Sequence, residues 1–194
     1  MKRMILSILA VFVVLFGVSF ALNETAVRNA QEEHLYILQT LLPSEEGFVV
    51  VPYDGEDANI RSVHKSEEGF VVECVTYGYA GDIRMFVAVN MDGKVVGLVV
   101  RDAHETYGLG SRILTDHEFL AQFLNQSGSF EIATNGADAF SGATAEAATE
   151  GESIRVDGIS GATVSSKAVA RCVSSAVAYV TGADVASSAT TWGG

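Results

Sequence analysis

The segment from Met4 to Leu22 carries no charged side chain and is almost wholly apolar. In a helix, these nineteen residues extend about 28 Å, close to the hydrocarbon thickness of a bilayer. Lys2 and Arg3 precede the segment, and basic flanking residues stay on the cytoplasmic side. The segment therefore predicts an N-terminal membrane anchor, residues 1–23, with the rest of the chain on the extracytoplasmic side of the plasma (inner) membrane.

A cleaved signal peptide is the alternative interpretation of this segment. Ser19 and Ala21 are small residues at the spacing of a cleavage site. However, the apolar run is longer than the roughly 7–15 residues of a signal-peptide core, which favours a retained anchor. In both interpretations, the rest of the chain is exported across the membrane. Residues 24–43 have helical periodicity and end at Pro43, which predicts a juxtamembrane helix.

Composition excludes several classes of protein. The net charge of −12 over 194 residues argues against a nucleic-acid partner, because such proteins carry basic patches. Cys74 and Cys172 lie far apart without a CxxC motif, which excludes a zinc ribbon or an all-cysteine iron–sulfur site. We expect buried thiols there, with a disulfide as the alternative. The histidines have no ligand spacing, so no metal site is predicted.

From residue 44 the pattern predicts an α+β domain, residues 44–181, with a mainly antiparallel sheet and a few helices. The expected strands are 47–53, 69–79, 83–90, 94–101 and 153–156, with a hairpin at Asp92-Gly93. Expected helices are 116–125, capped by Thr115 or Asp116, and 164–180. In the first helix, Phe119, Leu120, Phe123 and Leu124 are expected to face inward. The second has an apolar stripe at helical spacing, formed by Ala168, Val169, Cys172, Val173, Ala176, Val177 and Val180. Residues 133–152 contain a single large apolar residue and are predicted to form a functional loop, and 182–194 a flexible tail.

The most informative short motif is Asp157-Gly158-Ile159-Ser160-Gly161-Ala162-Thr163, directly before the last predicted helix. A helix N-terminus offers unpaired N–H groups and the positive end of the dipole, and both favour phosphate. Thr163 places a hydroxyl there, which can cap the helix or be esterified. The alternative interpretation is that the motif only caps the helix and has no role in binding.

Asp157 to Thr163 resembles the DxxSGAT motif of FMN-binding domains, in which a flavin transferase esterifies the threonine with the phosphate of FMN. Residues 104–110, HETYGLG, resemble the ETPGLG loop of the same family. The resemblance implies covalent FMN on Thr163. It implies further cofactor contacts from Asp157, Ser160, Gly161, Ala162, Glu105, Thr106, Gly108, Leu109 and Gly110. Tyr107 replaces the usual proline, so its contact role is open.

Residues 138–144, DAFSGAT, also satisfy the motif. The residues after Thr144 are acidic and lack an apolar stripe, so an anionic phosphate is less stabilised there. We therefore favour Thr163 and keep Thr144 as a second candidate.

The layout from anchor to last helix resembles the G subunit of the Rnf electron-transport complexes, and its relative, the C subunit of the Na⁺-translocating NADH:quinone reductase. The resemblance implies an electron-transfer subunit of a ferredoxin:NAD oxidoreductase coupled to Na⁺ or H⁺ movement, with the other subunits as partners. The chain alone has no GxGxxG after a strand and no cluster motif. The alternatives are a stand-alone exported flavoprotein shuttle and a binding module in which SGAT only caps a helix.

Overall fold

The computed structural model describes residues 2–108, 110–133 and 153–183. Side chains of the N-terminal helix are described from residue 24 onward, and at Phe16 and Ser19. The chain divides into two units, Met1–Thr40 and Leu41–Gly194. The predicted loop beyond residue 133 and most of the predicted tail lie outside the described residues.

The first unit consists of helix α1, Lys2–Leu41, except for the last residue of that helix, which is counted with the second unit. Instead of two helices, the chain forms a single one that ends two residues before Pro43, since proline cannot continue a helix. In the part of the chain that the structure describes, no helix is long and apolar enough to span a membrane. The anchor therefore stays a prediction.

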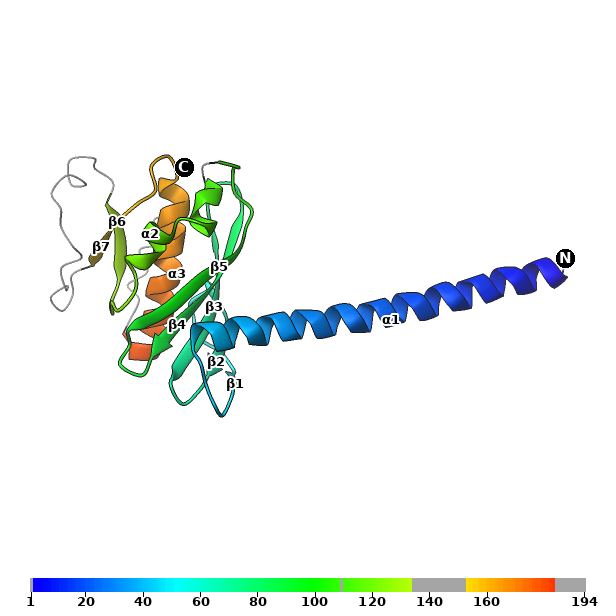
Figure 1. Ribbon diagram of the computed structural model, residues 1–194. Coiled ribbons are helices and arrows are strands. Elements are labelled where there is room, and N and C mark those ends of the chain that lie inside the picture. The colour runs from blue at the N-terminus through cyan, green and yellow to red at the C-terminus, as the bar shows by residue number, and fades with distance from the viewer. Residues whose placement is uncertain (1, 109, 134–152, 184–194) are drawn as a thin grey trace. The chain divides into compact units, whose positions relative to one another are not determined.

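The second unit is built on a five-stranded antiparallel sheet in the order β1-β2-β3-β4-β5 (Figure 1). Its strands are β1 (Val49–Val51), β2 (Ile60–Lys65), β3 (Gly69–Tyr77), β4 (Asp82–Asn90) and β5 (Val95–Ala103). Each strand pairs with its neighbour in sequence. The hairpin predicted at Asp92-Gly93 joins β4 to β5, and Asn90 Oδ1 accepts hydrogen bonds from two amides of the turn.

Helix α3, Thr163–Thr181, packs against β3 and β4 of this sheet. The predicted apolar stripe of this helix is confirmed, because six of its seven members are buried and only Val180 is half-buried: Ala168, Val169, Cys172, Val173, Ala176, Val177 and Val180. Strand β4 supplies the facing core with side chains such as Met85 and Val87, which are fully buried. The antiparallel α+β prediction is therefore confirmed for this unit.

A short parallel pair, β6 (Phe130–Ala133) and β7 (Ile154–Asp157), lies outside the main sheet. The sequence predicted β7 but not β6, nor β2 in the main sheet. Both missed strands are short, and Arg61, His64 and Glu131 interrupt their apolar character. A single sheet was expected, and the parallel pair corrects that expectation.

Helix α2, His117–Ala121, is capped by Asp116, whose carboxylate accepts from Phe119 N. A 3-10 helix, η1 (Gly110–Leu114), precedes it. α2 is shorter than predicted, and the chain continues in turns after Ala121. Phe119 and Phe123 are buried as expected, and Leu120 is half-buried. Leu124 is 37% exposed, because the helix ends at Ala121 and the helical spacing does not continue to Leu124.

Cys74 and Cys172 are free and buried, so the prediction of buried thiols is confirmed. Cys74 Sγ donates to the carbonyl oxygen of Cys172 at 3.6 Å. The contact with Cys172 and burial raise the pKa of the Cys74 thiol, which keeps it protonated. The two thiols therefore belong to the packing between β3 and α3.

Candidate functional site

Helix α3 begins at Thr163 without a side-chain cap. Ala162 occupies the N-cap position, and it has no hydroxyl or carboxylate to offer the N–H groups of the first turn. Those N–H groups carry the positive end of the helix dipole and attract anions. Thr163 is exposed, as are Ser160 and Gly161. The interpretation of Thr163 as a helix cap is therefore wrong, and its hydroxyl lies at an open helix N-terminus.

The turn before α3 is held by a serine that the motif does not include. Ser166 Oγ accepts from Ile159 N and donates to the carbonyl oxygen of Ala162, each at 3.0 Å. Ala162 N donates to Ile159 O at 2.9 Å and closes the turn. Because Ser166 is fully buried, water cannot replace it. Thr163 therefore directly follows a turn that is closed by three hydrogen bonds.

Asp157 ends β7, and its backbone is held by one side chain. Gln122 Oε1 accepts from Asp157 N at 2.9 Å, and Gln122 Nε2 donates to Asp157 O at 3.2 Å. The residue itself is exposed. The structure therefore fixes the main chain of Asp157 through α2's C-cap residue and leaves the side chain at the surface.

The 104–110 loop is held mainly by Glu105. Its Oε1 accepts from Tyr79 N at 2.7 Å, and its Oε2 accepts from Ala80 N at 3.2 Å. Farther along the loop, Ser111 Oγ accepts from Gly108 N at 3.0 Å. Tyr107 is 96% exposed. Both oxygens of Glu105 are thus engaged with the turn between β3 and β4.

The loop and the start of α3 lie side by side, although the sequence separates them widely. A Cβ added to Gly110 would come within 3.0 Å of Ser165 Oγ in the first turn of α3. Figure 1 shows η1 beside the beginning of α3, in agreement with contacts between the two elements. Ser165 is fully buried, and its hydroxyl has no hydrogen-bond partner in the described structure. The two predicted segments therefore meet at one end of the domain.

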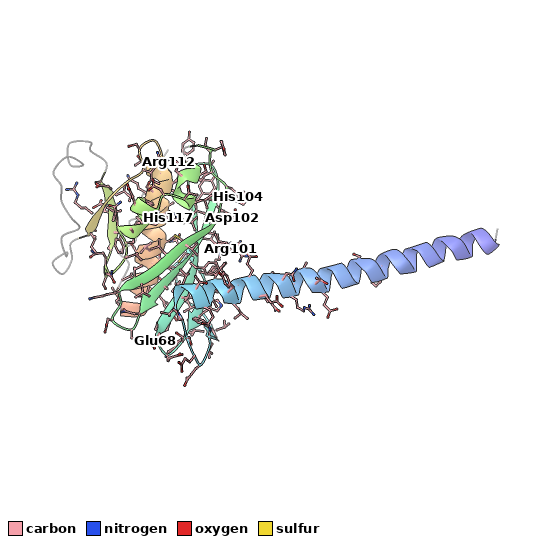
Figure 2. All side chains as sticks on the ribbon, viewed as in Figure 1. Glu68, Arg101, Asp102, His104, Arg112 and His117 are labelled. Carbon is pink, nitrogen blue, oxygen red and sulfur yellow. The ribbon has the colours of Figure 1, made fainter. Side chains whose placement is uncertain are left out.

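The remaining predicted residues are placed as follows. Thr106 is exposed, and its carbonyl oxygen accepts from Ser111 N at 3.2 Å. Leu109, Thr144 and the whole 138–144 motif lie outside the described residues. His104 Nδ1 lies 3.9 Å from Asp102 Oδ2 at the end of β5, with both side chains exposed (Figure 2). Within the described ranges, no cluster of three His, Cys, Asp or Glu side chains could hold a metal ion.

Sequence reasoning missed four residues that shape this end of the domain. Ser165 and Ser166 follow the motif directly, and serines in a first helical turn were a readable signal of local bonding. Gly78 and Gln122 act on residues that are distant in sequence, so no local pattern points to them.

The chain matches a known protein family. The profile of the FMN-binding domain matches residues 78–178, from the β3–β4 turn to the last turns of α3. This match covers more than half of the chain and includes both segments of the site. The chain therefore belongs to the FMN-binding domain family.

Among curated relatives, the chain is 34% identical over 112 residues to the G subunit of the proton-translocating ferredoxin:NAD(+) oxidoreductase complex of Clostridium ljungdahlii. That match covers 58% of this chain and 53% of the relative. It is 33% identical over 134 residues to the G subunit of the ion-translocating oxidoreductase complex of Methanosarcina acetivorans, covering 68% and 59%. The chain thus spans little more than half the length of these two relatives.

Among solved structures, NqrC of Shewanella oneidensis is similar to this chain, with a TM-score of 0.44 and 18% identity. This match covers 74% of this chain and 73% of that one.

Proposed function

We propose that this chain is a membrane-anchored electron-transfer subunit that carries FMN as a phosphoester on Thr163. It works within an Rnf-type complex that exchanges electrons between ferredoxin and NAD, coupled to Na⁺ or H⁺ translocation. The single observation that carries the attachment site is the open start of α3, where Thr163 is exposed and Ala162 provides no cap. The complex is inferred from the relatives, which are named as subunits of such assemblies.

The residues present fit a phosphate ester at this position. The Thr163 hydroxyl is exposed and lies next to the unpaired N–H groups of the first helical turn. These N–H groups can donate hydrogen bonds to a phosphate, and the positive end of the helix dipole attracts its negative charge. No carboxylate caps this helix, so none competes with the anion. Ser165, in the same turn, has a fully buried hydroxyl with no hydrogen-bond partner in the described structure.

Each part of the chain then has a defined task. In the proposed loading step, Thr163 Oγ1 would give up its proton and form the bond to phosphorus of an activated flavin nucleotide held by the flavin transferase. The phosphoanhydride bond of that donor would break in the same step, and its second nucleotide would leave with the electron pair. Ser166 keeps the turn rigid, so that the ester is presented at a fixed place. FMN, when bound, supplies the electron transfer, and the protein supplies attachment, orientation and electrostatics.

The uncharged segment from Met4 to Leu22 would hold this domain at the membrane, facing away from the cytoplasm. A covalent ester suits that location, because a dissociating cofactor would be lost there. Membrane anchoring and the flavin transferase are parts of the proposal, as is the coupling ion.

The test is the intact mass of the full chain, expressed with and without a flavin transferase. We expect one added FMN phosphoester in the presence of the transferase, and none in Thr163→Ala. The same spectrum shows whether the N-terminal segment has been cleaved. Thr144→Ala is the matched control, and it should keep the full adduct. An adduct that persists in Thr163→Ala and disappears in Thr144→Ala would transfer the attachment site to residue 144.

A further inference from the structure

The carboxylate of Glu105 is held on four sides. Oε1 accepts from Tyr79 N and Oε2 accepts from Ala80 N, at 2.7 and 3.2 Å. Gly78 lies against Oε1, and Gly110 lies against Oε2. We call this arrangement the Glu105 clasp, consisting of Glu105 with residues 78–80 and Gly110. Each oxygen of the carboxylate therefore has one N–H donor and one glycine beside it.

The two glycines explain how a carboxylate can fit into this place. A Cβ on Gly78 would overlap Oε1, and a Cβ on Gly110 would come within 2.6 Å of Oε2. Both glycines are buried, so a side chain at either position would have to displace the carboxylate. Hydrogen bonds from backbone N–H groups to an ionised carboxylate are stronger than neutral ones. The clasp therefore holds the β3–β4 turn and the 104–110 loop together.

The clasp also reaches the helix that begins at Thr163. Gly110 separates Glu105 from Ser165, whose oxygen would lie 3.0 Å from an added Cβ at that glycine. Ser165 belongs to the first turn of α3, two residues after Thr163. Contacts thus run without a break from the Tyr79 and Ala80 amides through Glu105 and Gly110 to the start of α3.

We propose that Glu105 is a positioning residue that sets the place of the 104–110 loop against the start of α3, and so limits the access of water to a flavin attached at Thr163. This inference rests on the proposed function. It differs from the expectation that Glu105 contacts the cofactor itself, because both oxygens already accept backbone hydrogen bonds.

Two variants open the clasp by different routes. Glu105→Gln removes the charge and turns one acceptor into an N–H donor that faces an N–H group. Gly78→Ala keeps the charge and displaces the carboxylate through the overlap with Oε1. If both act through the clasp, the double variant is no worse than Glu105→Gln alone.

The chain contains a matched control in Glu67. This carboxylate also accepts from two backbone amides, Glu45 N at 2.8 Å and Glu46 N at 3.4 Å, and it bonds with the Ser44 hydroxyl at 2.7 Å. It lies before β3, whereas the Glu105 clasp lies after β3. Glu67→Gln therefore removes an equivalent loop contact far from Thr163.

The experiment uses the full chain loaded with flavin by the transferase. First, hydrogen exchange of the Tyr79 and Ala80 amides should accelerate about tenfold or more in Glu105→Gln, as expected for the loss of hydrogen bonds to a charged group. Second, iodide should quench the flavin fluorescence more strongly than in the wild type. Third, the midpoint potential should move toward that of free FMN by at least about 30 mV, the equivalent of tenfold in a two-electron equilibrium.

Gly78→Ala should change the three readouts in the same direction, and Glu67→Gln should leave the flavin readouts unchanged. The proposal is overturned if the amides exchange faster while quenching and potential stay at wild-type values, because the clasp is then only structural. It is also overturned if Glu67→Gln shifts the flavin equally, or if the amides do not respond. Should Glu105→Gln load poorly, Gly78→Ala provides the flavin readouts. A wild-type chain without any flavin mass would instead reject the proposed function, and the amide exchange would still test the clasp.

Discussion

Two loop regions, one before strand β3 and one after it, are stabilised by the same kinds of interaction. The Glu67 end comprises residues 44–47 and Glu67, and the Glu105 end comprises residues 78–81, the 104–110 loop and the start of α3. Each end has a serine hydroxyl that closes a turn, a glycine with positive φ, and a carboxylate that accepts from two backbone amides. The hydrogen-bonding pattern alone therefore does not distinguish a structural end from a functional one.

Burial distinguishes the two ends. Ser44 is half-buried and Glu45 and Glu46 are exposed, so water reaches the bonds of the Glu67 end. At the Glu105 end, Ser166 is fully buried and the glycines on both sides of the carboxylate are buried. The bonds of the turn-closing serine are thus enclosed where α3 begins, whereas the amides of Tyr79 and Ala80 that bind Glu105 are exposed like those of Glu45 and Glu46. A change at the buried serine or at the two buried glycines is transmitted to neighbouring residues instead of being absorbed by solvent.

The largest expected effect concerns the two turn-closing serines. Ser166→Ala leaves Ile159 N unpaired in the interior, which costs about 2 kcal/mol of the free energy of unfolding. Ser44→Ala should cost about 0.5 kcal/mol, because water can replace the hydroxyl at a half-buried site. Denaturant unfolding of the two variants measures the difference.

The rate at which flavin is attached to Thr163 tests whether Ser166 also matters for function. Ser166→Ala should also slow the attachment at Thr163, since the turn that presents the threonine loosens. Ser174→Ala is the control: Ser174 is a buried serine of α3 that accepts from Phe130 N at 2.9 Å, so its loss should destabilise the fold without changing the loading rate. Equal loading rates in the Ser166 and Ser174 variants would contradict the role given to Ser166.

The sequence was sufficient to predict the elements with strong periodicity and to find the segment that contains the candidate site. The stripe on α3 and the hairpin at Asp92-Gly93 were predicted, because local repetition and turn chemistry determine them. Strand β6 was missed, since it is short and its pairing with β7 comes from a segment more than twenty residues away. Local patterns do not encode such a pairing.

The candidate site, like the fold, was predicted from the sequence only in part. The motif residues 157–163 were found, but the contact of Gly110 with Ser165 and the role of Gly78 depend on packing between distant segments. The assignment of Thr163 as a possible cap failed for a related reason. The helix already includes Thr163 as its first residue, whereas a cap at Thr163 would require it to begin one residue later, and that boundary depends on the bonds of Ser166.

A middle-sized effect is expected at the glycines with positive φ. Gly47 has φ +83° and Gly108 has φ +79°, and an added Cβ meets nothing within 4 Å at either position. Alanine at each should therefore cost about 1 kcal/mol, entirely from backbone strain. Thermal unfolding should show equal losses, whereas only Gly108→Ala should alter the quenching of the attached flavin. A flavin response to Gly47→Ala would remove the distinction between the two ends.

The smallest effect is a pH dependence confined to the Glu67 end. Hydrogen bonds from its own amide, from the Ser44 hydroxyl and from the amides of Glu45 and Glu46 lower the pKa of Glu67 below the ordinary 4.5. A lowered pKa in the folded state means that the stabilisation is complete above the ordinary glutamate pKa and is lost as the pH falls through the lowered value. Because the carboxylate is fully exposed, solvent weakens the contribution, and global stability should hardly change. The amide protons of Glu45 and Glu46 should shift in NMR spectra with an apparent pKa below 4.5, and this titration should vanish in Glu67→Gln. A titration that persists in that variant would mean that another group holds the 44–47 turn, and the Glu67 end would no longer be a valid match for the Glu105 end.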